Sequence, residues 1–145
     1  MPFQVRWLIP RRIVTMYMYG TLALDDFKAM YDISTQHMEA GSAPVHMLSI
    51  LDQSAEYSKS PNSIAAMIKI GGRLHPNTGW VLQITANVFQ RFIGTMIAHS
   101  MGNVRYAAMP TPAEALAFLK DRDVTLSEID AAALAAEYQR HQPTP

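Results

Sequence analysis

The stretch VHMLSILDQSAEYSKSPNS, residues 45–63, changes character in its middle. Its first seven residues are almost continuously apolar, whereas the rest begins with Asp52 and holds several hydroxyl side chains. A short apolar run of this kind is typical of a strand that is covered on both faces, as in a parallel sheet. Ser60-Pro61 then favours a helix start, because proline is well tolerated in the first helical turn. The stretch therefore predicts a strand, a polar loop and a helix, which is the repeating unit of an α/β fold.

The N-terminal segment predicts a β-hairpin. FQVRWL (3–8) alternates apolar and polar residues, and RIVTMYMYG (12–20) is rich in β-branched and aromatic residues. Both patterns are typical of strands, and Ile9-Pro10-Arg11 between them is short enough for a hairpin turn.

Helical and strand patterns alternate through the rest of the chain. Residues 24–40 show helical spacing. Further along the chain, strands are predicted at 80–86 and 104–109, with a helix between them that ends at Gly102. The inward positions of the 24–40 helix are Phe27, Met30, Tyr31, Ile33, Ser34 and Met38.

Two T-x-x-E motifs predict the last two helix starts. Thr111 to Glu114 and Thr125 to Glu128 have the spacing of a capping box, in which the hydroxyl and the carboxylate each accept from an unpaired backbone N–H. We therefore expect an α/β domain over residues 1–122 and a helical extension with a disordered tail over 123–145.

These patterns together predict one mixed, mostly parallel sheet with helices packed on it. Helical crossovers join parallel strands, whereas a hairpin joins antiparallel ones. The N-terminal hairpin is therefore expected to supply the antiparallel edge of the sheet. The side chains expected to be well buried are Trp7, Leu48, Leu51, Val81, Leu82, Ile84, Leu116 and Leu119.

Composition limits the classes of function. The chain has 145 residues, a formal net charge of zero and no cysteine, so thiol chemistry and zinc–thiolate sites are excluded and general attraction to nucleic acid is not expected. No apolar run approaches the length of a membrane span, and residues 1–12 lack the pattern of a signal peptide. We expect a cytoplasmic protein.

Three motifs give the chain a resemblance to a known family. G-T-L-A-L-D-D-F (20–27), V-H-M-L-S-I-L-D-Q-S (45–54) and T-P-A-E-A-L-A-F-L (111–119) resemble the corresponding parts of STAS domains of the SpoIIAA-like type. The likeness covers about residues 3–122. It implies a non-enzymatic regulatory module that binds a protein partner or itself.

The resemblance has a departure and an alternative. Sigma-factor antagonists of this family are phosphorylated in a D-S-S-G motif at the start of the second helix, where this chain has Ser60-Pro61-Asn62-Ser63 instead. The topology is also similar to that of CRAL-TRIO domains, which implies a carrier of a small, lipid-like molecule.

The sequence holds no pattern typical of a catalytic or metal site. A serine nucleophile needs a base within hydrogen-bond reach and a group that orients the base, and no G-x-S-x-G motif is present. None of the five histidines has metal-ligand spacing, and His46 is expected to be a histidine paired with its neighbours. We expect no enzymatic activity, no cofactor and no metal.

Two sets of residues are candidates for binding. Polar side chains after the 45–51 strand could form a partner surface, but we favour an Asx turn at the acid and a helix cap at the serines as their explanation. This first set is Asp52, Ser54, Ser58, Ser60 and Ser63.

The second set is an apolar stripe formed by Phe89, Phe92 and Met96, which could line a groove for an apolar molecule or simply belong to the core. The chain's ten methionines allow the same two interpretations, because methionine fills cores and is also common on adaptable binding surfaces.

Overall fold

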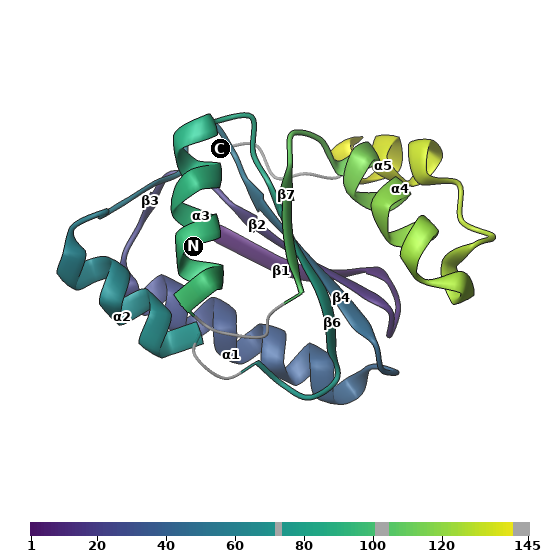
Figure 1. The fold of residues 1–145 in the computed structure, drawn as a ribbon, viewed down its shortest axis with the longest axis horizontal. Coiled ribbons are helices and arrows are strands. Elements are labelled where there is room, and N and C mark those ends of the chain that lie inside the picture. Colours follow the sequence, from purple (N-terminus) through teal and green to yellow (C-terminus); the bar gives the residue numbers. More distant parts are fainter. Residues whose placement is uncertain (72–73, 101–104, 141–145) are drawn as a thin grey trace.

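The computed structural model describes residues 1–71, 74–100 and 105–140, and it contains a mixed five-stranded sheet with helices on both faces (Figure 1). β1 runs antiparallel to β2, and all other neighbours are parallel. In spatial order the strands are β1 (Phe3–Ile9), β2 (Ile13–Met18), β4 (Val45–Leu51), β6 (Thr78–Ile84) and β7 (Tyr106–Met109). The predicted α/β fold with an antiparallel N-terminal edge is confirmed.

A pair of very short strands lies outside this sheet and was not predicted. β3 (Thr21–Leu22) and β5 (Glu56–Tyr57) pair in parallel, each over two residues. They join the segments that follow β2 and β4. Two residues are too few to give a periodic sequence signal.

The hairpin turn has a left-handed residue. Arg11 has a φ of 68°, and the Arg12 N–H donates to the Ile9 carbonyl at 3.0 Å. The turn reverses the chain between β1 and β2, and this reversal makes β1 the antiparallel edge.

The connections explain why the helices separate into two layers. α1 (Leu24–Ala40), α2 (Pro61–Gly71) and α3 (Val88–Ser100) each join one strand to its next neighbour in the same direction along the sheet. Since such crossovers are right-handed, all three helices lie on one face. α4 (Pro112–Arg122) and α5 (Ala131–Arg140) cover the opposite face (Figure 1).

Buried hydrophobic side chains pack on both sides of the sheet. On the α4 and α5 side, Leu48 and Leu82 pack with Leu116 and Leu119, and Tyr138 of α5 belongs to the same cluster. Leu126 and Ala135, which also follow residue 122, belong to this cluster as well. On the other side, the buried side chains include those of Met18, Met30, Met38 and Met47.

The predicted burial is largely confirmed. Five of the eight predicted residues are buried, namely Leu48, Leu82, Ile84, Leu116 and Leu119. The other three, Trp7, Leu51 and Val81, are half-buried, and none of the eight is exposed.

One of the two predicted capping boxes starts a helix and the other does not. The Thr111 hydroxyl accepts from the Glu114 N–H at the start of α4, as predicted. The prediction for Thr125 was wrong, because Asp123 accepts from the Thr125 N–H and begins a short 3₁₀ helix at Val124–Leu126. α5 starts only at Ala131, where Asp130 accepts from the Ala133 N–H.

Three further predictions, namely a helix end at Gly102, a strand beginning at Val104 and a disordered tail at residues 143–145, fall outside the described residues.

Candidate functional site

Asp52 forms a local turn at the carboxyl end of β4. Its Oδ2 accepts from the Ser54 N–H at 2.9 Å and from the Ser54 hydroxyl at 2.6 Å, which is an Asx turn. Its Oδ1 accepts from the Tyr17 hydroxyl at 3.0 Å. The Ser54 hydroxyl in turn accepts from the Gly20 N–H at 3.1 Å. Asp52 and Ser54 thus tie the loop after β4 to the segment after β2.

The electrostatics of this pair fit an ionised, structural carboxylate. Burial alone would raise the pKa of Asp52, but hydrogen bonds from Ser54 and Tyr17 lower it below its ordinary value. Burial and the neighbouring carboxylate raise the pKa of Tyr17. At neutral pH Asp52 is therefore an acceptor and Tyr17 a donor.

The other three candidate serines lie together at the start of α2. Ser58, Ser60 and Ser63 form a closed ring of hydroxyl contacts of 2.9–3.3 Å. The Ser60 hydroxyl also accepts from the Ser63 N–H at 3.2 Å, so Ser60 is the N-cap of α2. This arrangement gives the three serines a local structural role.

A cavity of about 220 Å³ lies between the sheet and the layer formed by α1, α2 and α3. Strands β2, β4, β6 and β7 contribute to its floor, and α1, α2 and α3 contribute to its walls. Most of its lining is apolar. Its residues are Met16, Met18, Phe27, Met30, Tyr31, Ser34, Met47, Ser49, Leu51, Tyr57, Met67, Ile70, Gly71, Leu74, Val81, Gln83, Gly94, Ile97, Ala98 and Tyr106.

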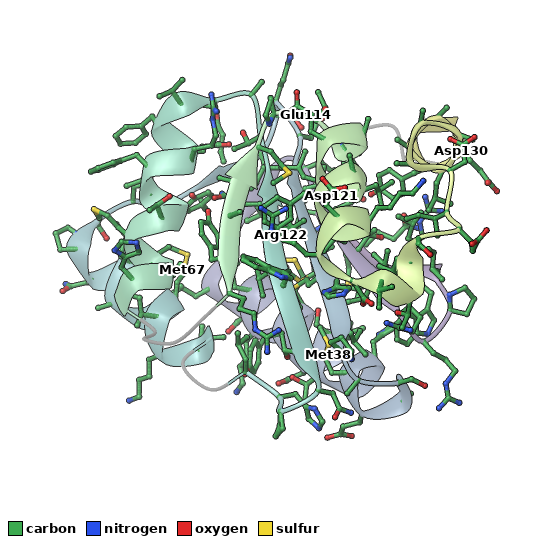
Figure 2. All side chains as sticks on the ribbon, turned by 45° about the vertical axis from the view of Figure 1, so that its right-hand side comes forward. Met38, Met67, Glu114, Asp121, Arg122 and Asp130 are labelled. Atoms are coloured by element: carbon green, nitrogen blue, oxygen red, sulfur yellow. The ribbon has the colours of Figure 1, made fainter. Side chains whose placement is uncertain are left out.

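The helix α2 covers the cavity without burying any of its own side chains completely. Met67, Ile70 and Gly71 are the α2 residues of the lining. Figure 2 shows Met67 beside α2 and α3, away from Asp121 and Arg122 of α4. The cavity and the α4–α5 layer thus lie on different faces of the sheet.

The α3 residues of the predicted apolar stripe do not line the cavity. Phe89, Phe92 and Met96 are 56%, 59% and 41% exposed, and none of them lines the cavity. The lining takes Gly94, Ile97 and Ala98 instead, which lie on the opposite side of the same helix at 100° per residue. Nearly the whole circumference of α3 carries apolar residues, so periodicity could not identify its inner side.

Polar side chains meet at one part of the cavity wall. The Tyr106 hydroxyl donates to the Gln83 Oε1, and the Gln83 amide lies 3.5 Å from the Gln90 carbonyl. Burial raises the pKa of Tyr106 to about 12, so its hydroxyl keeps its proton at neutral pH. Gly94 permits this arrangement, because a Cβ there would lie 1.8 Å from the Gln83 Oε1.

Ser34 is a cavity residue whose hydroxyl has no hydrogen-bond partner within the described part of the chain. It is 2% exposed and lies on the inner side of α1. A serine within an otherwise apolar helix face was the sequence signal for this position. The significance of Ser34 depends on the cavity, which only the fold reveals.

His46 belongs to a separate polar cluster on the other face of the sheet. Its Nε2 lies 2.8 Å from the Asp123 Oδ2, and the Trp80 N–H donates to its Nδ1 at 3.0 Å. Arg12 pairs with the same Asp123 oxygen at 2.9 Å. Both ring nitrogens of His46 are hydrogen-bonded, and the partner of Nδ1 is a backbone amide. No serine among the described residues is therefore hydrogen-bonded to the ring, as a serine nucleophile would have to be if His46 were its base. His46 is paired with its neighbours, as expected.

Two general properties of the described residues bear on function. No group of three or more histidine, aspartate or glutamate side chains within residues 1–71, 74–100 and 105–140 could hold a metal ion. Within the same ranges, no helix combines the length and the apolar character needed to cross a membrane.

Comparisons with known proteins gave no match. No protein-family model matches the chain, and neither a curated protein nor a solved structure is significantly similar to it. The resemblance to STAS and CRAL-TRIO domains therefore stays a prediction based on motifs and topology.

Proposed function

We propose that this protein is a non-enzymatic carrier or sensor of a small, apolar molecule, which it binds between the sheet and helices α1, α2 and α3. The observation that carries this proposal is the cavity of about 220 Å³ with its mostly apolar lining. The cavity is partly open to solvent, so a small molecule could enter it, and concave, mostly apolar pockets are the usual binding sites for such molecules.

The volume limits the size of the ligand. An apolar cavity of about 150 Å³ is known to admit benzene. The cavity of this protein is larger by about half, which suits one or two fused rings or a medium-length alkyl chain. Drug-sized pockets are typically about 300–1,000 Å³. The ligand should thus be small.

The lining suits an adaptable site. Five of the chain's ten methionines line the cavity, namely Met16, Met18, Met30, Met47 and Met67. Methionine has three rotatable side-chain bonds and a polarizable sulfur, and it adjusts to ligands of differing shape. Several related apolar molecules could therefore bind.

The other expected function, a regulatory module acting through residues 52–63, stays a prediction. The candidate side chains of that segment already bond one another, as an Asx turn and a helix cap. These hydrogen bonds explain the polar residues of the segment without invoking a partner protein. The proposed function is therefore based on the cavity and not on this segment. Phosphosite mapping of Ser60 and Ser63 after incubation with a cell lysate would test the regulatory alternative.

Native mass spectrometry of protein purified without added ligand tests the proposed function. We expect a fraction of the protein to carry a co-purified small molecule. Ala98→Leu places a larger side chain at a cavity residue that is 6% exposed, and it should abolish that adduct. Ala117→Leu on the exposed surface of α4 is the matched control and should retain it. Wild-type protein that carries no adduct and binds no added apolar probe would contradict the proposal.

A further inference from the structure

The buried hydroxyl of Ser34 points to the chemistry of the ligand. Buried polar groups in proteins are nearly always hydrogen-bonded, and an exception calls for a specific explanation. Ser34 is 2% exposed, lines the cavity and has no partner for its Oγ among the described residues. A hydrogen-bonding group on a bound molecule would satisfy this hydroxyl.

One group of polar side chains at the cavity wall is already hydrogen-bonded. The Tyr106 hydroxyl donates to Gln83, and the Gln83 amide faces the Gln90 carbonyl. The Gln90 side chain is itself held by Thr85 at 3.1 Å. Among the described residues of the lining, Ser34 is thus the buried one whose hydroxyl has no partner, whereas Ser49 and Tyr57 are only half-buried.

The lining also limits the charge of the ligand. Within the part of the chain that the structure describes, every cavity residue is apolar or uncharged: there is no lysine, arginine, histidine, aspartate or glutamate among them. A charged group transferred into such surroundings without a partner of opposite charge would lose its hydration uncompensated. A carboxylate or an ammonium group is therefore a poor ligand for this cavity.

We infer that the ligand is an uncharged apolar molecule with one hydroxyl or carbonyl group, and that the Ser34 hydroxyl is its hydrogen-bond anchor. The inference rests on the proposed function and adds the ligand class to it. A serine hydroxyl both donates and accepts, so an alcohol, a phenol or a ketone can each pair with it. The apolar remainder of the ligand would lie against the methionines and the apolar residues of α2 and α3.

Three probes of one shape test this inference: naphthalene, 2-naphthol and 2-naphthoate. Binding to the full-length protein at pH 7 would be measured by isothermal titration calorimetry and by native mass spectrometry. We expect 2-naphthol to bind roughly threefold to tenfold more tightly than naphthalene, which is the usual gain from one neutral hydrogen bond. We expect 2-naphthoate to bind more weakly than both.

The Ser34→Ala variant tests whether Ser34 is the anchor. Its affinity for 2-naphthol should fall by the same threefold to tenfold factor, while its affinity for naphthalene should stay unchanged. The unchanged affinity for naphthalene would also show that the cavity is intact. Ser49→Ala and Tyr57→Phe remove other hydroxyls of the lining and serve as matched controls. Both should keep the preference.

The outcomes separate this inference from the proposed function. If naphthalene binds but 2-naphthol gains nothing, or if Ser49→Ala rather than Ser34→Ala removes the gain, the anchor is refuted and the cavity function survives. Binding of 2-naphthoate as tight as that of 2-naphthol would refute the uncharged ligand class. If none of the probes binds and Ala98→Leu changes nothing, the cavity function fails together with the inference.

Discussion

His46 Nε2 lies 2.8 Å from Asp123 Oδ2, and this contact joins the start of β4 to the residue that follows α4. The Trp80 N–H donates to the His46 Nδ1, so the ring proton is on Nε2 and points at the carboxylate. His46 is therefore neutral in the folded protein. A side chain at Gly79 would meet the ring, because a Cβ there would lie 2.5 Å from the Nδ1.

Acid should destabilise the fold through His46. Burial lowers the pKa of His46 below its ordinary value of 6.5, although Asp123 opposes this shift. In the unfolded chain His46 binds a proton near pH 6.5, whereas in the folded chain it does so only at lower pH. The stabilisation that neutral His46 contributes is therefore complete above pH 6.5 and decreases as the pH falls below it. Urea unfolding between pH 8 and 5 measures the effect. His46→Asn should remove this pH dependence, whereas His99→Asn, at an exposed position of α3, should leave it unchanged.

Asp123 should add a second acid transition at lower pH. Burial alone would raise the pKa of Asp123, but hydrogen bonds from Thr125 and His46, together with the charge of Arg12, lower it to about 2 from 3.8. The stability from this carboxylate is present above pH 4 and is lost as pH falls towards 2, by at most about 2 kcal/mol. Urea unfolding of Asp123→Asn between pH 5 and 2 should show a smaller slope than the wild type. An equal slope would show that Asp123 is not the titrating group.

The sequence could predict the fold because several local signals agreed. The apolar run 45–51, the alternating segment 3–8 and the Thr111 cap each favoured the element that the structure contains. The sequence signal at Thr125 failed because the nearby Asp123 competes for the same backbone N–H. Capping spacing alone does not show which of two acceptors a backbone donor will use.

The cavity could be predicted only in outline. The many methionines indicated an adaptable apolar region, and five of them line the cavity. Its wall was assigned to Phe89, Phe92 and Met96 because α3 is apolar nearly all round, and its inner side depends on how α2 and the sheet contact it. The unpaired Ser34 hydroxyl depends on contacts between distant segments, which no local pattern contains.

Truncation of two neighbouring residues of α3 should change the free energy of unfolding by very different amounts. Ile93 is 5% exposed, so Ile93→Ala should lower the free energy of unfolding by about 2–5 kcal/mol through lost packing. Phe92 is 59% exposed, so Phe92→Ala should change it by about 0.5 kcal/mol or less. Thermal and urea unfolding of the two variants would measure both values. A large loss for Phe92→Ala would contradict the described orientation of α3.

The cap of α2 should contribute measurably to stability. The Ser60 hydroxyl accepts from the Ser63 N–H, and removing such a cap costs about 1 kcal/mol. Ser60→Ala should therefore lower the free energy of unfolding by that amount in urea unfolding. Asn62→Ala changes an exposed residue two positions later and is the control. If both variants unfold like the wild type, the serine ring does not hold the start of α2.

A second serine-to-alanine change should have the opposite sign. In the ligand-free protein the Ser34 hydroxyl is buried without a partner among the described residues, and such a group lowers stability. Alanine also has the higher helix propensity within α1. Ser34→Ala should therefore raise the free energy of unfolding by about 0.5–1 kcal/mol.

The same substitution should weaken the binding of a hydroxylated ligand, so stability and affinity would change in opposite directions. Urea unfolding of ligand-free wild type, Ser34→Ala and Ser60→Ala, each repeated with saturating 2-naphthol, measures both effects in one series. The ligand should stabilise the wild type and Ser60→Ala by similar amounts, since binding to the folded state alone raises stability by mass action. It should stabilise Ser34→Ala less. A loss of ligand-free stability in Ser34→Ala would show that its hydroxyl is already paired within the protein and is not held for a ligand.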